Sequence, residues 1–156
     1  MEPLPGGGSA GRTPRLSFAE NGTIDPLSLN DLYRLVGWDR AGRRTTDETA
    51  EMLRVSRYYI AAYAGDRLVG FARVCGDPYV AQVLDVITQP EYRRLGIATQ
   101  CMVGVVAHLR QSRYVSVTLT DDTGLPDFYE RFGFRRLAPE TATRRWRPAA
   151  PHRTER

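Results

Sequence analysis

A glycine-bearing segment after an apolar strand has the pattern of an anion-binding loop. It covers residues 88–99 and opens a helical stretch, with Gly96 and Ala98 near its centre. The free N–H groups of a helix's first turn bind anions, aided by the helix dipole. Small residues let a phosphate approach the backbone, and Arg93-Arg94 adds positive charge beside it. The segment predicts a phosphate or pyrophosphate site, although a plain strand-to-helix connection that binds nothing has the same pattern.

A carboxylate interrupts the apolar strand that precedes this loop. Asp85 lies in the run Gln82-Val83-Leu84-Asp85-Val86-Ile87, where its immediate neighbours are apolar. Burying a charge costs free energy, so such a residue usually has a partner or a chemical role. Two interpretations stay open: Asp85 orients or deprotonates a substrate, or it makes a structural hydrogen bond to a neighbouring helix.

Several other catalytic patterns are missing or misplaced. All 22 basic residues are arginine, which excludes a lysine-dependent phosphate loop and Schiff-base chemistry. The G-x-S-x-G match at residues 7–11 has no strand before it and no helix after it, so it is no hydrolase nucleophile elbow. The soft ligands Cys75, Cys101, His108 and His152 lack metal-site spacing. We therefore expect no metal.

Apolar periodicity and turn signals predict a single α/β domain built on one mixed sheet. The predicted elements are, in order, a strand at 16–18, helices at 25–36 and 46–54, strands at 58–63, 68–75 and 79–88, a helix at 95–111, a strand at 114–120, a helix at 126–132 and a final strand pair at 134–137 and 143–147. Thr46 and Asp47 are the candidates for the cap of the second helix.

Composition sets the limits of this domain. Residues 1–15 are rich in glycine, proline and arginine and are expected to form a disordered leader, and residues 148–156 a flexible tail, which leaves 16–147 as the domain. No apolar run has the length of a membrane span, and the N-terminus lacks the pattern of a secretory signal. We therefore expect a cytoplasmic protein with no membrane partner.

Positive charge is concentrated at the C-terminal end. Residues 135–156 hold seven arginines and two glutamates, a net charge of +5, whereas the whole chain of 156 residues carries +4. Such a run contacts phosphates or is simply a solvated tail. The near-neutral remainder contains no known nucleic-acid-binding motif, so we expect no nucleic-acid partner.

Three motifs in a fixed order give the chain a specific resemblance. Arg93-x-x-Gly96-x-Ala98 matches the Q/R-x-x-G-x-G/A loop of the GNAT superfamily of acetyl-CoA-dependent N-acetyltransferases. Val86-Ile87-Thr88-Gln89-Pro90 resembles that family's L-A-V-x-P strand end, and residues 128–134 resemble its F-Y-x-x-x-G-F signature. Residues 32–38 resemble a segment of small bacterial members. The resemblance covers about residues 16–147 and implies the GNAT fold, a central mixed, mostly antiparallel sheet flanked by about four helices.

The resemblance implies acetyl-CoA as the acetyl donor. The strand that ends at residues 86–88 would splay from the strand at 114–120 and pair with the pantetheine arm, while the backbone N–H groups of residues 94–99 would hold the pyrophosphate. Many members carry Asn where this chain has Asp122, which lacks the amide donor. The implied cofactor-binding residues are Val86, Ile87, Thr88, Arg93, Arg94, Leu95, Gly96, Ile97, Ala98, Thr99, Asp122, Phe128, Tyr129 and Arg131.

The same resemblance implies catalytic residues. Tyr129, within the F-Y-x-x-x-G-F motif, is the candidate general acid that protonates the leaving CoA thiolate, and simple aromatic packing is the alternative. A similar Asp followed by two apolar residues occurs in the glucosamine-phosphate acetyltransferase branch, which makes Asp85 the second catalytic and acceptor-binding candidate. Aromatic residues that either line the acceptor pocket or pack in the core are Tyr33, Trp38, Tyr58 and Tyr59.

The resemblance implies an N-acetyltransferase that moves the acetyl group of acetyl-CoA to a primary amine of a small molecule. The amine would attack directly in a ternary complex, without an acyl-enzyme. Asp122 and Ala98 depart from the family pattern and support an alternative, a catalytically silent acyl-CoA-binding module with a regulatory role. The identity of the acceptor, the acyl chain length and the choice between monomer and homodimer stay open.

Overall fold

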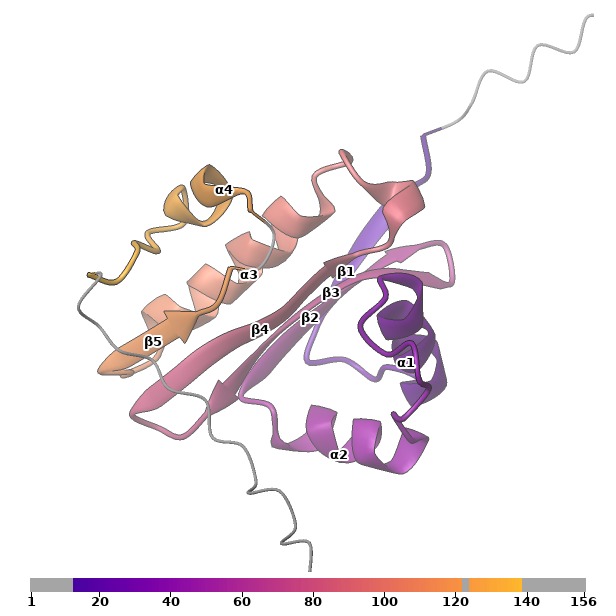
Figure 1. The fold of residues 1–156 in the computed structure, drawn as a ribbon, viewed down its shortest axis with the longest axis horizontal. Coiled ribbons are helices and arrows are strands. Elements are labelled where there is room, and N and C mark those ends of the chain that lie inside the picture. The colour runs from indigo at the N-terminus through magenta and orange to yellow at the C-terminus, as the bar shows by residue number, and fades with distance from the viewer. Residues whose placement is uncertain (1–12, 122–123, 139–156) are drawn as a thin grey trace, which may run out of the picture.

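The strands form one sheet, as the sequence predicts. The computed structural model describes residues 13–121 and 124–138, and in that part of the chain the sheet has five strands. The strands are β1 (Leu16–Glu20), β2 (Tyr58–Ala64), β3 (Arg67–Gly76), β4 (Val80–Thr88) and β5 (Ser116–Leu119). They lie side by side in chain order, antiparallel from β1 to β4, and β5 joins β4 in parallel (Figure 1). The predicted α/β class with a mixed, mostly antiparallel sheet is confirmed.

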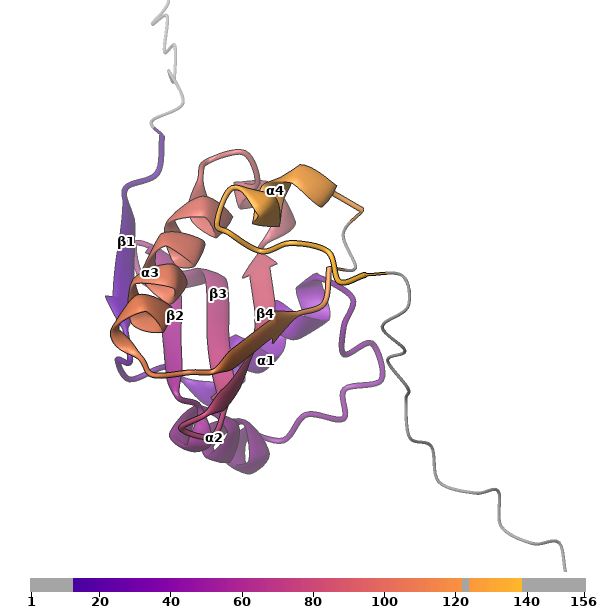
Figure 2. The same cartoon turned by 90° about the vertical axis from the view of Figure 1, so that its left-hand side faces the viewer.

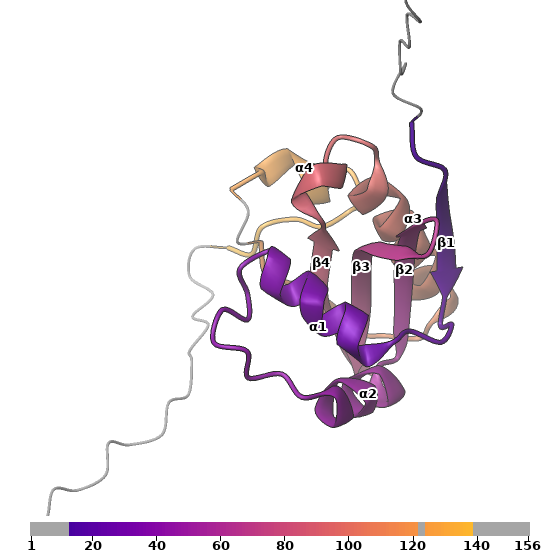
Figure 3. The same cartoon turned by 90° about the vertical axis from the view of Figure 1, so that its right-hand side faces the viewer.

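Helices cover both faces of this sheet. The helices are α1 (Pro26–Leu35), α2 (Thr46–Val55), α3 (Ile97–Gln111) and α4 (Pro126–Glu130), and a 3-10 turn, η1 (Pro90–Tyr92), precedes α3. α3 and α4 lie on one face, whereas α1 lies on the other (Figures 2 and 3). The side chain of Asp25 caps α1 by accepting the N–H groups of Leu27 and Ser28. α2 is capped by Thr45, one residue before the predicted candidates.

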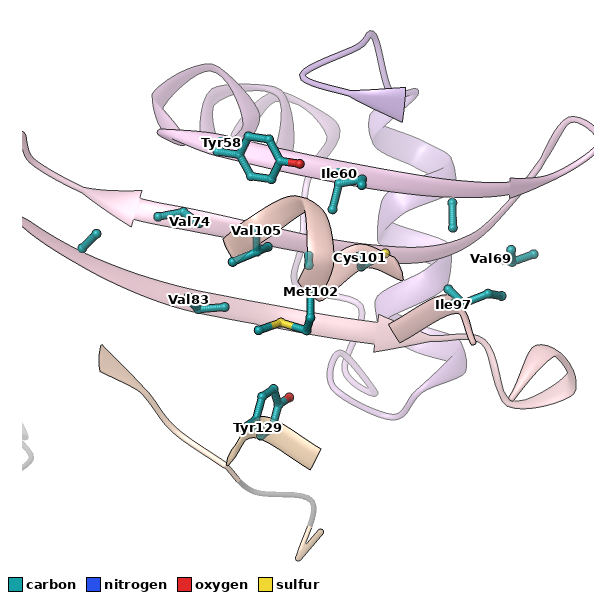
Figure 4. Packing of buried hydrophobic residues seen from close by; sticks show 13 residues of the cluster. Tyr58, Ile60, Val69, Val74, Val83, Ile97, Cys101, Met102, Val105 and Tyr129 are labelled. Carbon is teal, nitrogen blue, oxygen red and sulfur yellow. The ribbon is translucent and has the colours of Figure 1, made fainter. Parts of the chain in front are cut away.

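Each face of the sheet has its own apolar cluster. Val83 and Met102 belong to the cluster under α3 (Figure 4), and Leu29 and Phe71 belong to the cluster under α1. Gly70 permits the close approach of α3, because a Cβ at that position would collide with the side chain of Ile97. The central part of the sheet is therefore buried on both sides, although Val80 and Gln82 at the start of β4 are exposed.

A bulge in β4 reverses the side to which its residues point. Phe71 pairs with Ile87, but Arg73 pairs with Leu84, so β4 holds one residue more than β3 across this interval. Residues four apart on a regular strand share a face. Here Val83 lies in the α3 cluster and Ile87 in the α1 cluster. Asp85 lies at the bulge, with a left-handed φ of 55°.

The structure departs from the predicted elements at two places. α3 begins at Ile97 rather than 95, because Arg94 (φ 64°) and Gly96 (φ 77°) have left-handed backbones. The strand predicted at 134–137 is wrong: these residues are irregular, and the N–H of Phe134 donates to the carbonyl of Tyr129, which closes the turn after α4. Its predicted partner at 143–147 lies outside the described residues.

Candidate active site

The parallel pair of β4 and β5 opens halfway along β4. The ladder runs from Val80–Ser116 to Val83–Leu119, but β4 continues to Thr88. Beyond Val83, this edge of β4 has no partner strand within the described residues. An unpaired strand edge presents N–H and C=O groups that can pair with an extended ligand. The predicted splay of these two strands is confirmed.

A cleft of about 390 Å³ lies at this opening. Its lining residues are Trp38, Val83, Leu84, Asp85, Val86, Leu119, Thr120 and Tyr129. Trp38 follows α1, on one face of the sheet, and Tyr129 comes from α4, on the other. The splayed strands thus bring together side chains from both faces, among them both predicted catalytic residues.

Asp85 is held in this cleft by two short hydrogen bonds. The Tyr33 hydroxyl and the Arg73 Nε each donate to Asp85 Oδ2 over 2.6 Å. The side chains of Arg73 and Asp85 are 15% and 16% exposed, so the two form a largely buried ion pair. A buried pair contributes little net stability, but removing one partner leaves an uncompensated charge. The structural hydrogen bond to a neighbouring helix that the sequence left open is present, and it comes from Tyr33 on α1.

Tyr33 supports Asp85 from behind and does not line the cleft. It is fully buried, and the Arg44 guanidinium lies 3.5 Å from its ring centroid. Burial, followed by the charge of Asp85, raises the pKa of Tyr33 above its ordinary value. The phenol therefore stays protonated and acts as a donor. Direct contact between Tyr33 and an acceptor, which the sequence suggested, does not fit this burial.

Arg73 is the site residue that the sequence analysis missed. It lies on β3, between the buried residues Ala72 and Val74. Burial lowers its pKa, but the hydrogen bond and the charge of Asp85 outweigh that effect and the pKa is raised. The signal was in the sequence, because a lone charge within an apolar strand is the same pattern that singled out Asp85.

Tyr129 is placed by an aromatic cluster around α4. The residue is 8% exposed, and its ring packs edge-on against Phe128, with ring centroids 4.9 Å apart. Phe134 approaches it at 6.5 Å. In Figure 4 the ring projects from α4 toward Met102 and β4. Packing therefore fixes the ring, and the same side chain lines the cleft, so the two interpretations of Tyr129 are compatible.

The glycine loop has the geometry of an open anion site. Gly96 caps α3 from a left-handed conformation, and nothing lies within 4 Å of the position that a Cβ would take there. Ile97 is buried and anchors the first turn of α3, whereas Leu95 is 40% exposed. Among the described residues, Thr88 Oγ1 is a buried side-chain oxygen without a hydrogen-bond partner. This loop and the open edge of β4 could together hold an elongated phosphorylated ligand.

The remaining candidates are more scattered. Phe128 and Arg131 line a second hollow with Leu125 and Asp127, not the main cleft. Asp122 lies outside the described residues. Of the aromatic candidates, Trp38 lines the cleft and is 54% exposed.

Tyr58 and Tyr59 lie away from the cleft. Tyr58 is buried under α3 and donates to Glu20 Oε1 over 2.5 Å. The hydroxyl of Tyr59 donates to the carbonyl of Gly22 over 2.7 Å. Both phenols therefore serve the core, as the packing alternative proposed.

Two kinds of feature are absent from the described part of the chain. No cluster of His, Cys, Asp or Glu within residues 13–121 and 124–138 could hold a metal ion. No helix in the same ranges is long and apolar enough to cross a membrane.

Comparisons with known proteins relate the chain to acetyltransferases. Among curated relatives, the chain is 30% identical over 122 residues to "Uncharacterized N-acetyltransferase ycf52-like" of Prochlorococcus marinus, a match that covers 75% of this chain and 66% of the relative. It is 35% identical over 116 residues to "Uncharacterized N-acetyltransferase ycf52" of Porphyra purpurea, covering 71% and 65%. The chain therefore spans about two thirds of the length of these relatives.

A solved structure supports the fold. A probable acetyltransferase from Staphylococcus aureus aligns with a TM-score of 0.72 at 20% identity and covers 86% of this chain and 100% of its own. The family model described as "Acetyltransferase (GNAT) domain" matches residues 30–151, most of the domain predicted from the sequence. The chain belongs to the GNAT acetyltransferase family.

Proposed function

We propose that this protein is an acetyl-CoA-dependent N-acetyltransferase that acts on a primary amine of a small molecule. The observation that carries the proposal is the cleft at the β4–β5 opening, which places Asp85 and Tyr129 in one lining. Its volume of about 390 Å³ falls in the range of small-molecule sites. Curated relatives whose names state an acceptor differ, since one is a "Histone acetyltransferase TAP1" and another a "Serotonin N-acetyltransferase 2, chloroplastic". The small cleft favours a small amine.

The residues present fit acetyl-CoA, which supplies an activated acetyl thioester. The N–H groups of residues 94–99 would bind its pyrophosphate beside the open space at Gly96. Arg93 and Arg94 add positive charge at the same loop. The edge of β4 at Val86–Thr88 would pair with the pantetheine, and Thr88 Oγ1, now without a partner, offers a further polar contact. Phe128 and Arg131, which line the second hollow, are proposed to contact the same ligand, and so is Asp122, which lies outside the described residues.

The proposed reaction is direct attack of a neutral amine on the thioester carbonyl. The C–N bond forms and the C–S bond breaks, the neutral amine loses one N–H proton to water, and the departing thiolate takes up one proton. Tyr129 would give the thiolate its proton and regain one from solvent. Holding the two reactants in line would supply much of the rate.

No acyl-enzyme is needed for this reaction. Cys101 is fully buried, and burial raises the pKa of its thiol to about 12. Its thiolate is therefore scarce at neutral pH, and Cys101 does not line the cleft. We propose a ternary complex of protein, acetyl-CoA and amine.

The lining of the cleft also indicates which amines suit it. Among its eight described residues, Asp85 alone carries a charge, so the cleft offers a partner for an ammonium group but no cation for a carboxylate. Trp38 presents a half-exposed indole that could cover an apolar body. We expect monoamines to be better acceptors than the amino acids that share their side chains.

The test measures thiol release from acetyl-CoA by the full chain with matched acceptor pairs. The pairs are 2-phenylethylamine with phenylalanine, histamine with histidine, and butylamine with norvaline. We expect amine-dependent release that is at least tenfold faster for the amine of a pair. Tight binding of acetyl-CoA in calorimetry without release for any acceptor would instead support the silent acyl-CoA-binding module, and absence of binding would overturn both.

A further inference from the structure

Both hydrogen bonds that hold Asp85 end on the same oxygen atom. The Tyr33 hydroxyl and the Arg73 Nε each donate to Oδ2, and no described residue donates to Oδ1. Each oxygen of an ionised carboxylate can accept two hydrogen bonds. Oδ2 is therefore fully used within the protein, whereas Oδ1 keeps its whole capacity for a donor from elsewhere.

Oδ1 is also within reach of solvent. Across the described residues, the buried side-chain oxygens that lack a partner are Thr88 Oγ1 and Gln89 Oε1. Asp85 Oδ1 lacks a partner but is not among these buried atoms, so water can reach it. Because Asp85 lines the cleft, the cleft provides that access.

The orientation of the carboxylate depends on its donors. The bulge, with φ of 55° at Asp85, determines where the Cβ points. The terminal torsion of an aspartate is soft, so hydrogen bonds decide which oxygen faces which way. Tyr33 is itself fixed, because it is fully buried and Arg44 covers its ring.

We propose that Tyr33 and Arg73 are positioning residues that clamp Asp85 Oδ2, so that Oδ1 faces the cleft and docks the ammonium group of the acceptor. The inference rests on the proposed function, since it concerns the acceptor side of the same cleft. The docked ammonium releases its proton to water before attack, and Asp85 Oδ1 then accepts a hydrogen bond from the neutral amine. Tyr33 and Arg73 thereby control where the nucleophilic nitrogen lies without contacting the acceptor themselves.

Tyr33→Phe is the primary test, because it removes one donor and leaves the ion pair of Arg73 and Asp85 intact. We expect the KM for 2-phenylethylamine to rise about tenfold, the effect of one hydrogen bond to a charged group. The kcat and the KM for acetyl-CoA should stay within about twofold. Tyr59→Phe is the matched control. Tyr59 packs against the apolar cluster on the same face of the sheet as Tyr33, and the change removes the hydrogen bond from its hydroxyl to the Gly22 carbonyl. Its amine KM should be that of the wild type.

A double-mutant cycle separates positioning from general destabilisation. If Tyr33 acts through Asp85, Tyr33→Phe should add little to the amine KM once Asp85→Asn is present. Asn tolerates the left-handed backbone at this position, so Asp85→Asn keeps the bulge. Arg73→Lys, which keeps the charge but not the planar donor, should raise the amine KM as Tyr33→Phe does. Additive effects, or an unchanged amine KM in Tyr33→Phe, would overturn the proposal.

A readout that needs no turnover keeps the two proposals distinguishable. Crystal structures of the wild type and of the variant that carries both Tyr33→Phe and Arg73→Lys should differ in the Asp85 carboxylate, which we expect to rotate away from its wild-type orientation. An unrotated carboxylate in the folded variant overturns the clamp, whatever the enzyme does. A wild type that shows the clamped carboxylate but acetylates none of the six acceptors would instead contradict the proposed function and leave the clamp without an acceptor to dock.

Discussion

Two phenol–carboxylate pairs lie on opposite faces of the sheet and have the same local chemistry. Tyr33 donates to Asp85 Oδ2 over 2.6 Å in the α1 cluster, and Tyr58 donates to Glu20 Oε1 over 2.5 Å in the α3 cluster. In both pairs burial and then the carboxylate raise the pKa of the phenol. Distance and pKa alone therefore do not tell a site from a structural bond.

The surroundings of the two pairs differ. Tyr58 stacks on His108 with centroids 4.8 Å apart, and a Cβ at Gly104 would come within 2.5 Å of its hydroxyl, so this phenol fits closely under α3. Glu20 is exposed at the end of β1 and lines neither described hollow. Asp85 is instead ion-paired, strained at a bulge and open to a cleft. Asp85 is the better candidate for chemistry because its charge is largely buried and yet lines a cleft, at the point where the β4–β5 ladder ends.

The largest difference should come from removing each carboxylate charge. Asp85→Asn is expected to lower kcat/KM about a hundredfold or more, with the loss on the acceptor side, because it removes the ammonium partner and any proton relay. It should also lower the Tm, since Arg73 is left buried without its ion-pair partner. Glu20→Gln should change both quantities little. Kinetics at a temperature where all variants are folded, with Tm from calorimetry, checks this, and equal activity losses would remove the distinction.

Tyr129→Phe tests the general acid proposed in the cleft. The change removes the proton donor and keeps the ring that packs against Phe128. CoA thiolate is a fairly good leaving group, so we expect kcat to fall roughly tenfold to a hundredfold, the low end of general acid catalysis. The KM for acetyl-CoA should barely change. A wild-type kcat would leave the fold standing and remove Tyr129 from the mechanism.

Gly96→Val tests the cofactor loop, with an effect of about tenfold. A Val at φ of 77° is strained, and its side chain would enter the open space proposed for the pyrophosphate. We expect at least tenfold weaker acetyl-CoA binding in calorimetry, about 1.4 kcal/mol. Gly65→Val is the matched control, because Gly65 has φ of 60° and open space around it but lies in the β2–β3 turn. Equal binding by the two variants would disprove the loop assignment.

Some features of the fold and the site could be predicted from the sequence, and others could not. Apolar periodicity and turn residues predicted the order of the helices and strands, and the chemistry of helix ends predicted the anion-binding loop at residues 88–99. The bulge was invisible, because no glycine or proline marks it and the left-handed residue is Asp85 itself. Without the bulge, the sides to which Val83 and Ile87 point cannot be assigned.

The aromatic residues show the same limit. Tyr33 and Trp38 are five residues apart, yet one is fully buried and the other is 54% exposed. Their roles depend on how α1 packs on the sheet, which periodicity alone does not determine. Asp85 was found because a charge in an apolar strand must be paired, and applying that rule to Arg73 would have found its partner as well.

The smallest expected effect is a change in how stability depends on pH, and it concerns His108, which stacks on Tyr58 of the Tyr58–Glu20 pair. Burial, and then the charge of Arg57, lower the pKa of His108 from its ordinary value of 6.5. The folded protein therefore binds fewer protons than the unfolded chain, so stability is complete above pH 6.5 and declines as the pH falls through and below it. The Tm of His108→Gln should fall less between pH 8 and pH 5 than that of the wild type. The kcat/KM at pH 8 should be unchanged, because His108 stacks on Tyr58 and lines no part of the cleft. His152→Gln, which changes the chain's other histidine, serves as the control and should keep the wild-type slope. If His108→Gln altered the pH dependence of turnover and not that of Tm, the region around Tyr58 and His108 would contribute to the reaction and not only to packing.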